Sequence, residues 1–186
     1  MDNTDNNVIM INGTSCAGKS SLSEYLVDNL EECYEHIAWD DYVESIKQDE
    51  RLSQDQKNDL ISLFLKDTSE KLQSGTKLIL DIVCVNTQTL QNLIDFYEPF
   101  GLLTIYMEAP ADILNEREQQ RPNRANGQAE AQLLQINDQE NHPPYDMNFD
   151  SSQQTTECIG QQVISTIKNQ ASPTIYTAPK HKGFKP

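Results

Sequence analysis

The chain has few basic residues, and this shortage excludes several classes of partner. Its 186 residues hold 14 Lys and Arg against 29 Asp and Glu, for a formal net charge of −15 at pH 7. Three of the lysines lie in the last sixteen residues, 171–186, which contain no acid, so the rest of the chain is more acidic still. Such a surface repels phosphate backbones and anionic headgroups, which argues against a nucleic-acid-binding protein and against a protein that binds anionic membranes.

Long apolar runs are also missing. No stretch approaches the roughly 20 apolar residues of a membrane-spanning helix, and the first residues, MDNTDNN, lack the positive charge and the apolar centre of a secretory signal. The four cysteines, at positions 16, 33, 84 and 158, show no CxxC spacing and no neighbouring His cluster. We therefore expect reduced thiols, no zinc site and a cytoplasmic protein without membrane attachment.

What the chain does contain is an alternation of short apolar runs and segments of helical periodicity. Residues 8–11 are wholly apolar, as in a parallel strand buried on both faces, and further strands are predicted at 36–39, 77–85, 102–107 and 147–149. Helices are predicted between them and at the end of the chain, at residues 22–30, 53–75, 90–97, around Leu114, and at 128–136 and 159–167. Strands that alternate with helices predict an α/β fold with a parallel sheet. We expect one domain over residues 1–170, followed by a basic, proline-containing tail over 171–186.

The run GTSCAGKS, residues 13–20, follows the first predicted strand and precedes the first predicted helix. It fits the pattern GxxxxGK[ST], in which the backbone N–H groups of a glycine-rich loop bind phosphate oxygens and the next helix adds its positive end. Lys19 would reach the phosphates, and the Ser20 hydroxyl would ligate Mg²⁺. The alternative is a glycine turn with an ordinary surface lysine. Such a turn would not need a strand before it and a helix after it, and both are predicted here. The predicted ATP-binding residues are Gly13, Thr14, Ser15, Cys16, Ala17, Gly18, Lys19 and Ser20.

Arginine is scarce and unevenly distributed. Of four arginines in the chain, Arg117, Arg121 and Arg124 fall within eight residues. Arg117 and Arg121 are i,i+4 neighbours on one predicted helical face, and Pro122 would end that helix so that Arg124 can fold back. A small kinase needs mobile cations that close over the transferred phosphoryl group and exclude water. The alternative is a solvated helix face on which these cations pair with neighbouring glutamates.

Three acids are predicted at the carboxyl edge of the sheet, where open α/β folds bind ligands. Asp40 and Asp41 close the second predicted strand, and Asp81 lies in the third. Because strand side chains alternate between faces, a strand that ends at Asp40 would direct Asp40 to the phosphates and leave Asp41 to begin the next turn or helix. The alternative for Asp40 is a helix N-cap. Asp81 would hold the magnesium shell, contact the substrate, or merely cap the strand end.

Several motifs follow one another along the chain in a characteristic order: INGTSCAGKS, WDDYVESI, LILDIV, EREQQRPNRANGQAEAQ and HPPYDMNFDSS. This order resembles the chloramphenicol phosphotransferase-like family of P-loop kinases, and the resemblance runs over residues 8–167. It implies a three-layer α/β/α fold with a five-stranded parallel sheet, and an ATP- and Mg²⁺-dependent kinase that phosphorylates a hydroxyl of a small molecule. It assigns the catalytic acid to Asp40, with Asp41 as the adjacent candidate. Ile82 stands where the family has a second acid after the one matching Asp81.

Two other functions fit parts of this pattern. A nucleotide or sugar-nucleotide kinase, similar to the zeta toxins, would share the phosphate loop but needs a subsite that reads a base. A nucleotide-switched binding protein would use the basic tail at residues 180–185 to dock a partner. Slow ATP hydrolysis without a phosphorylated acceptor would favour this last alternative.

Overall fold

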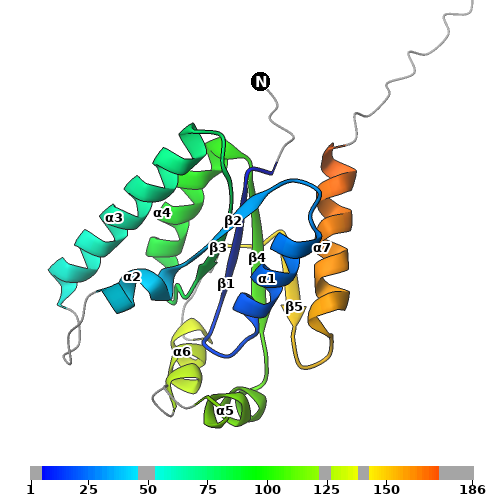
Figure 1. Ribbon diagram of the computed structural model, residues 1–186. Coiled ribbons are helices and arrows are strands. Elements are labelled where there is room, and N and C mark those ends of the chain that lie inside the picture. Colours follow the sequence, from blue (N-terminus) through cyan, green and yellow to red (C-terminus); the bar gives the residue numbers. More distant parts are fainter. Residues whose placement is uncertain (1–5, 46–52, 122–126, 138–142, 172–186) are drawn as a thin grey trace, which may run out of the picture.

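The computed structural model describes residues 6–45, 53–121, 127–137 and 143–171 (Figure 1). Its centre is a five-stranded parallel sheet with the strand order β2-β3-β1-β4-β5. The strands are β1 (Val8–Gly13), β2 (Tyr34–Ala38), β3 (Lys77–Ile82), β4 (Leu102–Glu108) and β5 (Met147–Asp150). The predicted α/β class and the five-stranded parallel sheet are therefore confirmed.

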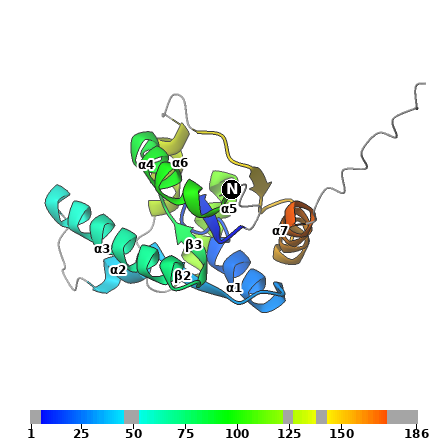
Figure 2. The same ribbon diagram turned by 90° about the horizontal axis from the view of Figure 1, so that it is seen from above.

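Helices cover both faces of this sheet. They are α1 (Lys19–Asn29), α2 (Trp39–Ser45), α3 (Gln54–Gln73), α4 (Thr87–Tyr97), the 3₁₀ turn η1 (Glu98–Phe100), α5 (Ala111–Gln119), α6 (Gln128–Asn137) and α7 (Thr156–Ala171). Ile9 and Ile11 of β1 pack into the layer of α1 and α7, whereas Val8 and Met10 pack into the layer of α3 and α4. The four apolar residues at the start of β1 are therefore explained, because the strand is buried on both faces. Figure 2 shows the two helical layers on either side of the strands.

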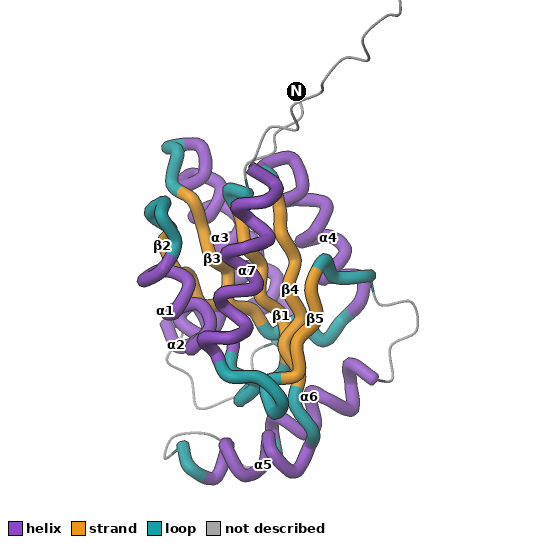
Figure 3. The backbone as a smooth tube through the Cα atoms, turned by 90° about the vertical axis from the view of Figure 1, so that its right-hand side faces the viewer, coloured by secondary structure: helices purple, strands orange, loops and turns teal. Residues whose placement is uncertain are grey.

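The helices α5 and α6 occupy a different place from the others. They lie beyond the carboxyl ends of the strands, at the same end of the sheet as the loop between β1 and α1 (Figures 1 and 3). Parallel strands bring all their carboxyl ends to this edge, so residues that are distant in the sequence meet here.

The predicted ends of the second and third strands are wrong, and the structure shows what takes the place of the strand at each. The second strand ends at Ala38 and α2 begins at Trp39, so Asp40 and Asp41 both lie in the first turn of a helix, where carboxylates are favoured. The third strand ends at Ile82 instead of residue 85. The Asn12 side chain there accepts from the Cys84 N–H and donates to the Cys84 carbonyl, at 2.8 and 3.0 Å, in place of a strand partner.

Other local predictions are confirmed. Ser53 caps α3, since its side chain accepts from the Gln56 N–H while the Gln56 side chain accepts from the Ser53 N–H, as the capping-box pattern predicts. The predicted tail lies outside the described residues except for Ala171. Within the described part of the chain, every helix is too short or too polar to cross a bilayer.

Candidate active site

Residues 13–20, the P-loop, connect β1 to α1 and pass close to β4. Gly13 has φ +154°, and a Cβ built on it would lie 2.1 Å from the carbonyl oxygen of Met107. Gly18 has φ +94° at the start of α1. A side chain is excluded at the first position by the β4 backbone and disfavoured at the second by the left-handed conformation. Cys16 also adopts a positive φ, of 63°, which is uncommon for a residue with a side chain.

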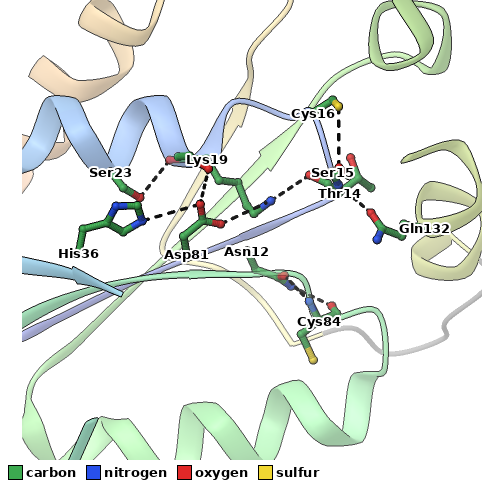
Figure 4. Close-up of polar contacts among 11 residues, drawn as sticks. Asn12, Thr14, Ser15, Cys16, Lys19, Ser23, His36, Asp81, Cys84 and Gln132 are labelled. Atoms are coloured by element: carbon green, nitrogen blue, oxygen red, sulfur yellow. Dashed lines mark hydrogen bonds and ion pairs between the residues drawn. The ribbon is translucent and has the colours of Figure 1, made fainter. Parts of the chain in front are cut away.

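Lys19 lies inside the curve of the P-loop. Only 6% of the residue is exposed, its Nζ donates to the Thr14 carbonyl at 3.0 Å, and the same atom lies 3.6 Å from Asp81 Oδ1 (Figure 4). A buried ammonium group requires such partners, because desolvation disfavours the charged form. The structure therefore holds a cation among the backbone groups of the loop.

Asp81 stands at the carboxyl end of β3, next to the P-loop, and is 7% exposed. Its Oδ2 accepts from the Ser20 hydroxyl at 2.7 Å and lies 3.9 Å from His36 Nε2. Burial alone raises the pKa of this carboxyl, but the His36 imidazole, the Lys19 ammonium and the Ser20 hydroxyl outweigh burial and hold the pKa below its ordinary value of 3.8. The group is therefore a carboxylate at neutral pH.

The oxygen atoms of Ser20 and Asp81 form a pair suited to Mg²⁺. This cation prefers oxygen ligands and keeps several water or phosphate ligands, so it needs only one or two protein groups. Within the described residues there is no group of three or more His, Cys, Asp or Glu side chains arranged so that they could hold a metal ion. The two residues predicted to hold the metal are thus brought together. The strand-cap alternative for Asp81 does not account for its contacts with Lys19 and Ser20.

Two hollows lie at this edge of the sheet. The first, the loop pocket, is small and polar, and its lining is Ser15, Cys16, Gly18, Lys19, Ser20, Asp40, Asp81, Val83 and Arg121. The second, the large cavity, has a volume of about 780 Å³. Its apolar lining is Trp39, Val43, Ile61, Phe64, Ile82, Val83, Cys84, Val85 and Leu93, and its polar lining is Asp40, Lys57, Asn86, Thr89, Gln128, Gln132 and Gln135.

Asp40 lines both hollows, together with Val83. It is half-buried in the first turn of α2, whereas Asp41, one residue further along the helix, is exposed. Successive residues of a helix point about 100° apart, so only one of the two acids can face the hollows. The structure thus separates Asp40 from Asp41, although by helical geometry and not by the strand alternation that the sequence predicts.

Arg117 and Arg121 do not share one helical face, because α5 ends between them. α5 ends at Gln119, so Arg121 lies just beyond the helix. The Arg121 backbone N–H donates to the Glu118 carbonyl, and Arg121 lines the loop pocket. Arg117, in α5, donates from Nη1 to the Cys16 carbonyl at 3.2 Å and from both terminal nitrogens to Ser151 at 2.8 Å. Two of the predicted cations are therefore brought to the P-loop, and the solvated-face alternative is wrong for Arg117. Arg124 lies outside the described residues.

Glu118 was missed as a site residue in the sequence, and Gln132 was noted only as part of the family motif, without a role of its own. Glu118 is 2% exposed, and its carboxylate accepts from the Gly127 and Ala129 N–H groups at 2.5 and 3.1 Å, so it caps the start of α6 from the neighbouring helix. Gln132 accepts from the Ser15 N–H at 2.7 Å. A capping signal is read from residues within one helical turn, and neither contact is local in the sequence. Both depend on how α5 and α6 pack.

Comparison with protein families gives a match over most of the chain. A family model described as "Chloramphenicol phosphotransferase-like protein" matches residues 6–168. No curated protein matches the sequence.

Solved structures share the fold at low sequence identity. A sugar kinase from Janibacter sp. HTCC2649 is 14% identical over 89% of this chain and 96% of that chain, with a TM-score of 0.68. The APS kinase of Mycobacterium tuberculosis, solved with AMPPNP and APS, is 14% identical over 88% and 98%, with a TM-score of 0.65. A tunicamycin resistance protein of Deinococcus radiodurans is 19% identical over 89% and 95%, with a TM-score of 0.60. At these identities the comparison establishes the architecture.

Proposed function

The chain belongs to the chloramphenicol phosphotransferase-like family, and from this we propose that it is a kinase that transfers the γ-phosphoryl group of ATP to a hydroxyl of a small molecule. The observation that carries the proposal is the position of Asp40, on the wall that the loop pocket and the large cavity share. A carboxylate at this boundary can accept a hydrogen bond from an alcohol in the large cavity and orient its oxygen toward a phosphate in the loop pocket.

The residues of the loop pocket suit the phosphate side of this reaction. The P-loop amides and Lys19 would bind the phosphates of ATP, and Ser20 with Asp81 would hold Mg²⁺, which when bound neutralises charge on the phosphate oxygens. Arg121 lines the same pocket and would stabilise charge on the transferred group, with Arg124 as a second candidate. Phosphoryl transfer passes through a loose transition state, so Asp40 contributes chiefly by positioning the acceptor hydroxyl.

Arg117 has a different role in this proposal. Its guanidinium bridges the Cys16 carbonyl and Ser151, so its hydrogen bonds hold the P-loop against the end of β5. We assign it to the shape of the loop, and the direct contact with the transferred phosphoryl group to Arg121.

The large cavity supports an uncharged acceptor with an apolar or aromatic part. Its volume of about 780 Å³ is that of a site for a drug-sized molecule. Trp39 and Phe64 meet edge to face in its wall, with ring centroids 5.5 Å apart. Among the lining residues that the structure describes, Asp40 and Lys57 are the charged ones. Within the described lining, the diphosphate of a sugar nucleotide would meet one lysine, Lys57, so we rank a nucleotide or sugar-nucleotide kinase as the second candidate.

The proposal is tested by incubating the protein with γ-labelled ATP, Mg²⁺ and a panel of hydroxyl compounds. The panel contains chloramphenicol, neutral aromatic alcohols, simple sugars and a UDP-sugar. We expect label on a neutral apolar or aromatic alcohol, at a rate well above hydrolysis, and its loss in Asp40→Asn. Label on the UDP-sugar alone would select the sugar-nucleotide alternative. Hydrolysis without any labelled acceptor would refute the kinase and support a nucleotide-switched binding protein.

A further inference from the structure

Two consecutive residues of the P-loop are bonded to the two helices at the carboxyl end of the sheet. The Ser15 N–H donates to Gln132 Oε1 of α6 at 2.7 Å, and the Cys16 carbonyl accepts from Arg117 of α5 at 3.2 Å. Figure 4 shows Gln132 directed from α6 toward Ser15. Since Glu118 of α5 caps α6, the loop and both helices form one closed hydrogen-bonded unit.

The two bonds respond differently to an anion in the P-loop. A carbonyl oxygen has no attraction for a phosphate, so the contact between Arg117 and Cys16 can persist when phosphate binds. The Ser15 N–H is a donor within a loop of the type whose amides bind phosphate, and Ser15 lines the loop pocket. A phosphate oxygen that takes this N–H therefore has to displace Gln132.

Gln132 also belongs to the large cavity. It lines that cavity together with Gln128 and Gln135, one turn before it and one turn after it on α6. A single side chain thus connects the loop that would bind the phosphate donor with the wall that would contact the acceptor.

We propose that Gln132 is a positioning residue that competes with phosphate for the Ser15 N–H and so transmits nucleotide binding to the acceptor wall. When the phosphates of ATP take this N–H, α6 loses its bond to the P-loop. The α6 side chains that line the large cavity can then move to the positions in which they contact the acceptor. This inference rests on the proposed function, because it requires ATP in the P-loop. It adds an order to the reaction, in which ATP prepares the cavity before the acceptor binds.

Two substitutions at this position should change nucleotide affinity in opposite directions. Gln132→Met keeps the length of the side chain but cannot accept a hydrogen bond, so the nucleotide no longer has to displace one. AMPPNP with Mg²⁺ should then bind about two- to tenfold more tightly, the range expected for one neutral hydrogen bond. Gln132→Glu keeps the acceptor, binds the N–H by a stronger charge-assisted bond and repels the phosphates, so AMPPNP should bind more weakly. Isothermal calorimetry measures both dissociation constants.

The matched controls are Gln135→Met and Gln135→Glu, on the same helix and in the wall of the same cavity. Gln135→Met should leave the AMPPNP dissociation constant unchanged, and Gln135→Glu should weaken binding less than Gln132→Glu. The lone tryptophan, Trp39, lines the large cavity and reports on its state through acrylamide quenching. AMPPNP should shift the quenching constant in the wild-type protein, and Gln132→Met should show the shifted value without nucleotide.

The outcomes separate this inference from the proposed function. If the wild-type protein binds AMPPNP but Gln132→Met binds it equally or more weakly, the competition between Gln132 and phosphate is refuted and the kinase proposal stands. Equal effects of the Met substitutions at positions 132 and 135 would refute it as well. If the wild-type protein does not bind AMPPNP at all, both proposals fail together.

Discussion

The two hollows at the carboxyl end of the sheet are built in different ways. The loop pocket takes most of its lining from one stretch of chain, residues 15–20, and adds four residues from elsewhere. The large cavity draws on α2, α3, α4, α6, the last residue of β3 and the segment after it, between residues 39 and 135. Phosphate is recognised chiefly by backbone N–H groups, which a short loop supplies by itself. A particular alcohol is recognised by side chains, which only packing can bring together.

The largest effect is expected in the loop pocket, from Lys19→Ala. Removal of the ammonium group should lower turnover about a thousandfold, since it withdraws a fixed positive charge from the phosphates. The substitution also leaves the buried Asp81 carboxylate without its nearest cation, so a modest drop in Tm should accompany the loss. Steady-state kinetics and thermal unfolding measure the two effects. Near-wild-type turnover would show that the loop does not hold the phosphates.

On the wall that the two hollows share, Asp40→Asn should lower kcat about a hundred- to a thousandfold and leave AMPPNP affinity unchanged. The amide retains the size of the carboxylate, but its neutral oxygen accepts a weaker hydrogen bond and so positions the acceptor hydroxyl less firmly, and it cannot take the hydroxyl proton. Asp41→Asn is the matched control, because Asp41 is exposed in the same helical turn. It should cost a little stability through the lost carboxylate near a helix N-terminus and leave kcat nearly unchanged. An inactive Asp41→Asn beside an active Asp40→Asn would reverse the assignment.

Substitution of Arg117 and of Arg121, the two arginines that the structure describes, should change different kinetic constants. Arg121→Ala should lower kcat about a hundredfold with little change in Tm, as expected for a group that acts in the transition state. Arg117→Ala should lower Tm and raise the KM for ATP, because its guanidinium supports the P-loop through Cys16 and Ser151. Kinetics with varied ATP and thermal unfolding make the distinction. If both variants showed only a lower Tm, with kcat and the KM for ATP unchanged, the two arginines would have a structural role alone.

Smaller, graded effects are expected in the large cavity. Ile61→Ala removes apolar contact from the cavity wall and should raise the KM for the acceptor found in the screen about tenfold, with kcat and the KM for ATP unchanged. Leu63→Ala on the same helix is the control, because Leu63 is exposed and outside the lining. An equal rise in KM for both variants would mean that the acceptor does not bind in this cavity.

The smallest effect concerns stability and pH. A carboxyl whose pKa is lower in the folded than in the unfolded state stabilises the fold above the unfolded value, and this contribution is lost as pH falls through the folded value. Asp81 is such a group, with its pKa below 3.8. The difference in unfolding free energy between the wild-type protein and Asp81→Asn should therefore be largest at neutral pH and shrink below about pH 4. Urea unfolding from pH 7 to pH 3 measures it, and a constant difference would contradict the prediction.

Much of the fold could be predicted because its signals are local. The apolar residues of β1 indicated a strand buried on both faces, and Ser53 with Gln56 indicated the start of α3. The end of β2 could not be predicted in the same way. Trp39 is compatible with a strand by propensity, but in the structure it begins α2 and packs edge to face on Phe64, a contact across 25 positions of the chain.

The P-loop, the parallel α/β sheet and most of the charged groups at the carboxyl edge could be predicted from the sequence alone. These depend on backbone geometry and on periodicity, both of which can be read from neighbouring residues. Which of these groups meet became clear from the folded structure: Asp40 lies at the boundary of two hollows, Arg117 contacts the P-loop, and Gln132 accepts from the Ser15 N–H. The physical reason is that each of these contacts joins elements far apart in the chain, whose relative positions are fixed by the packing of helices on a shared core.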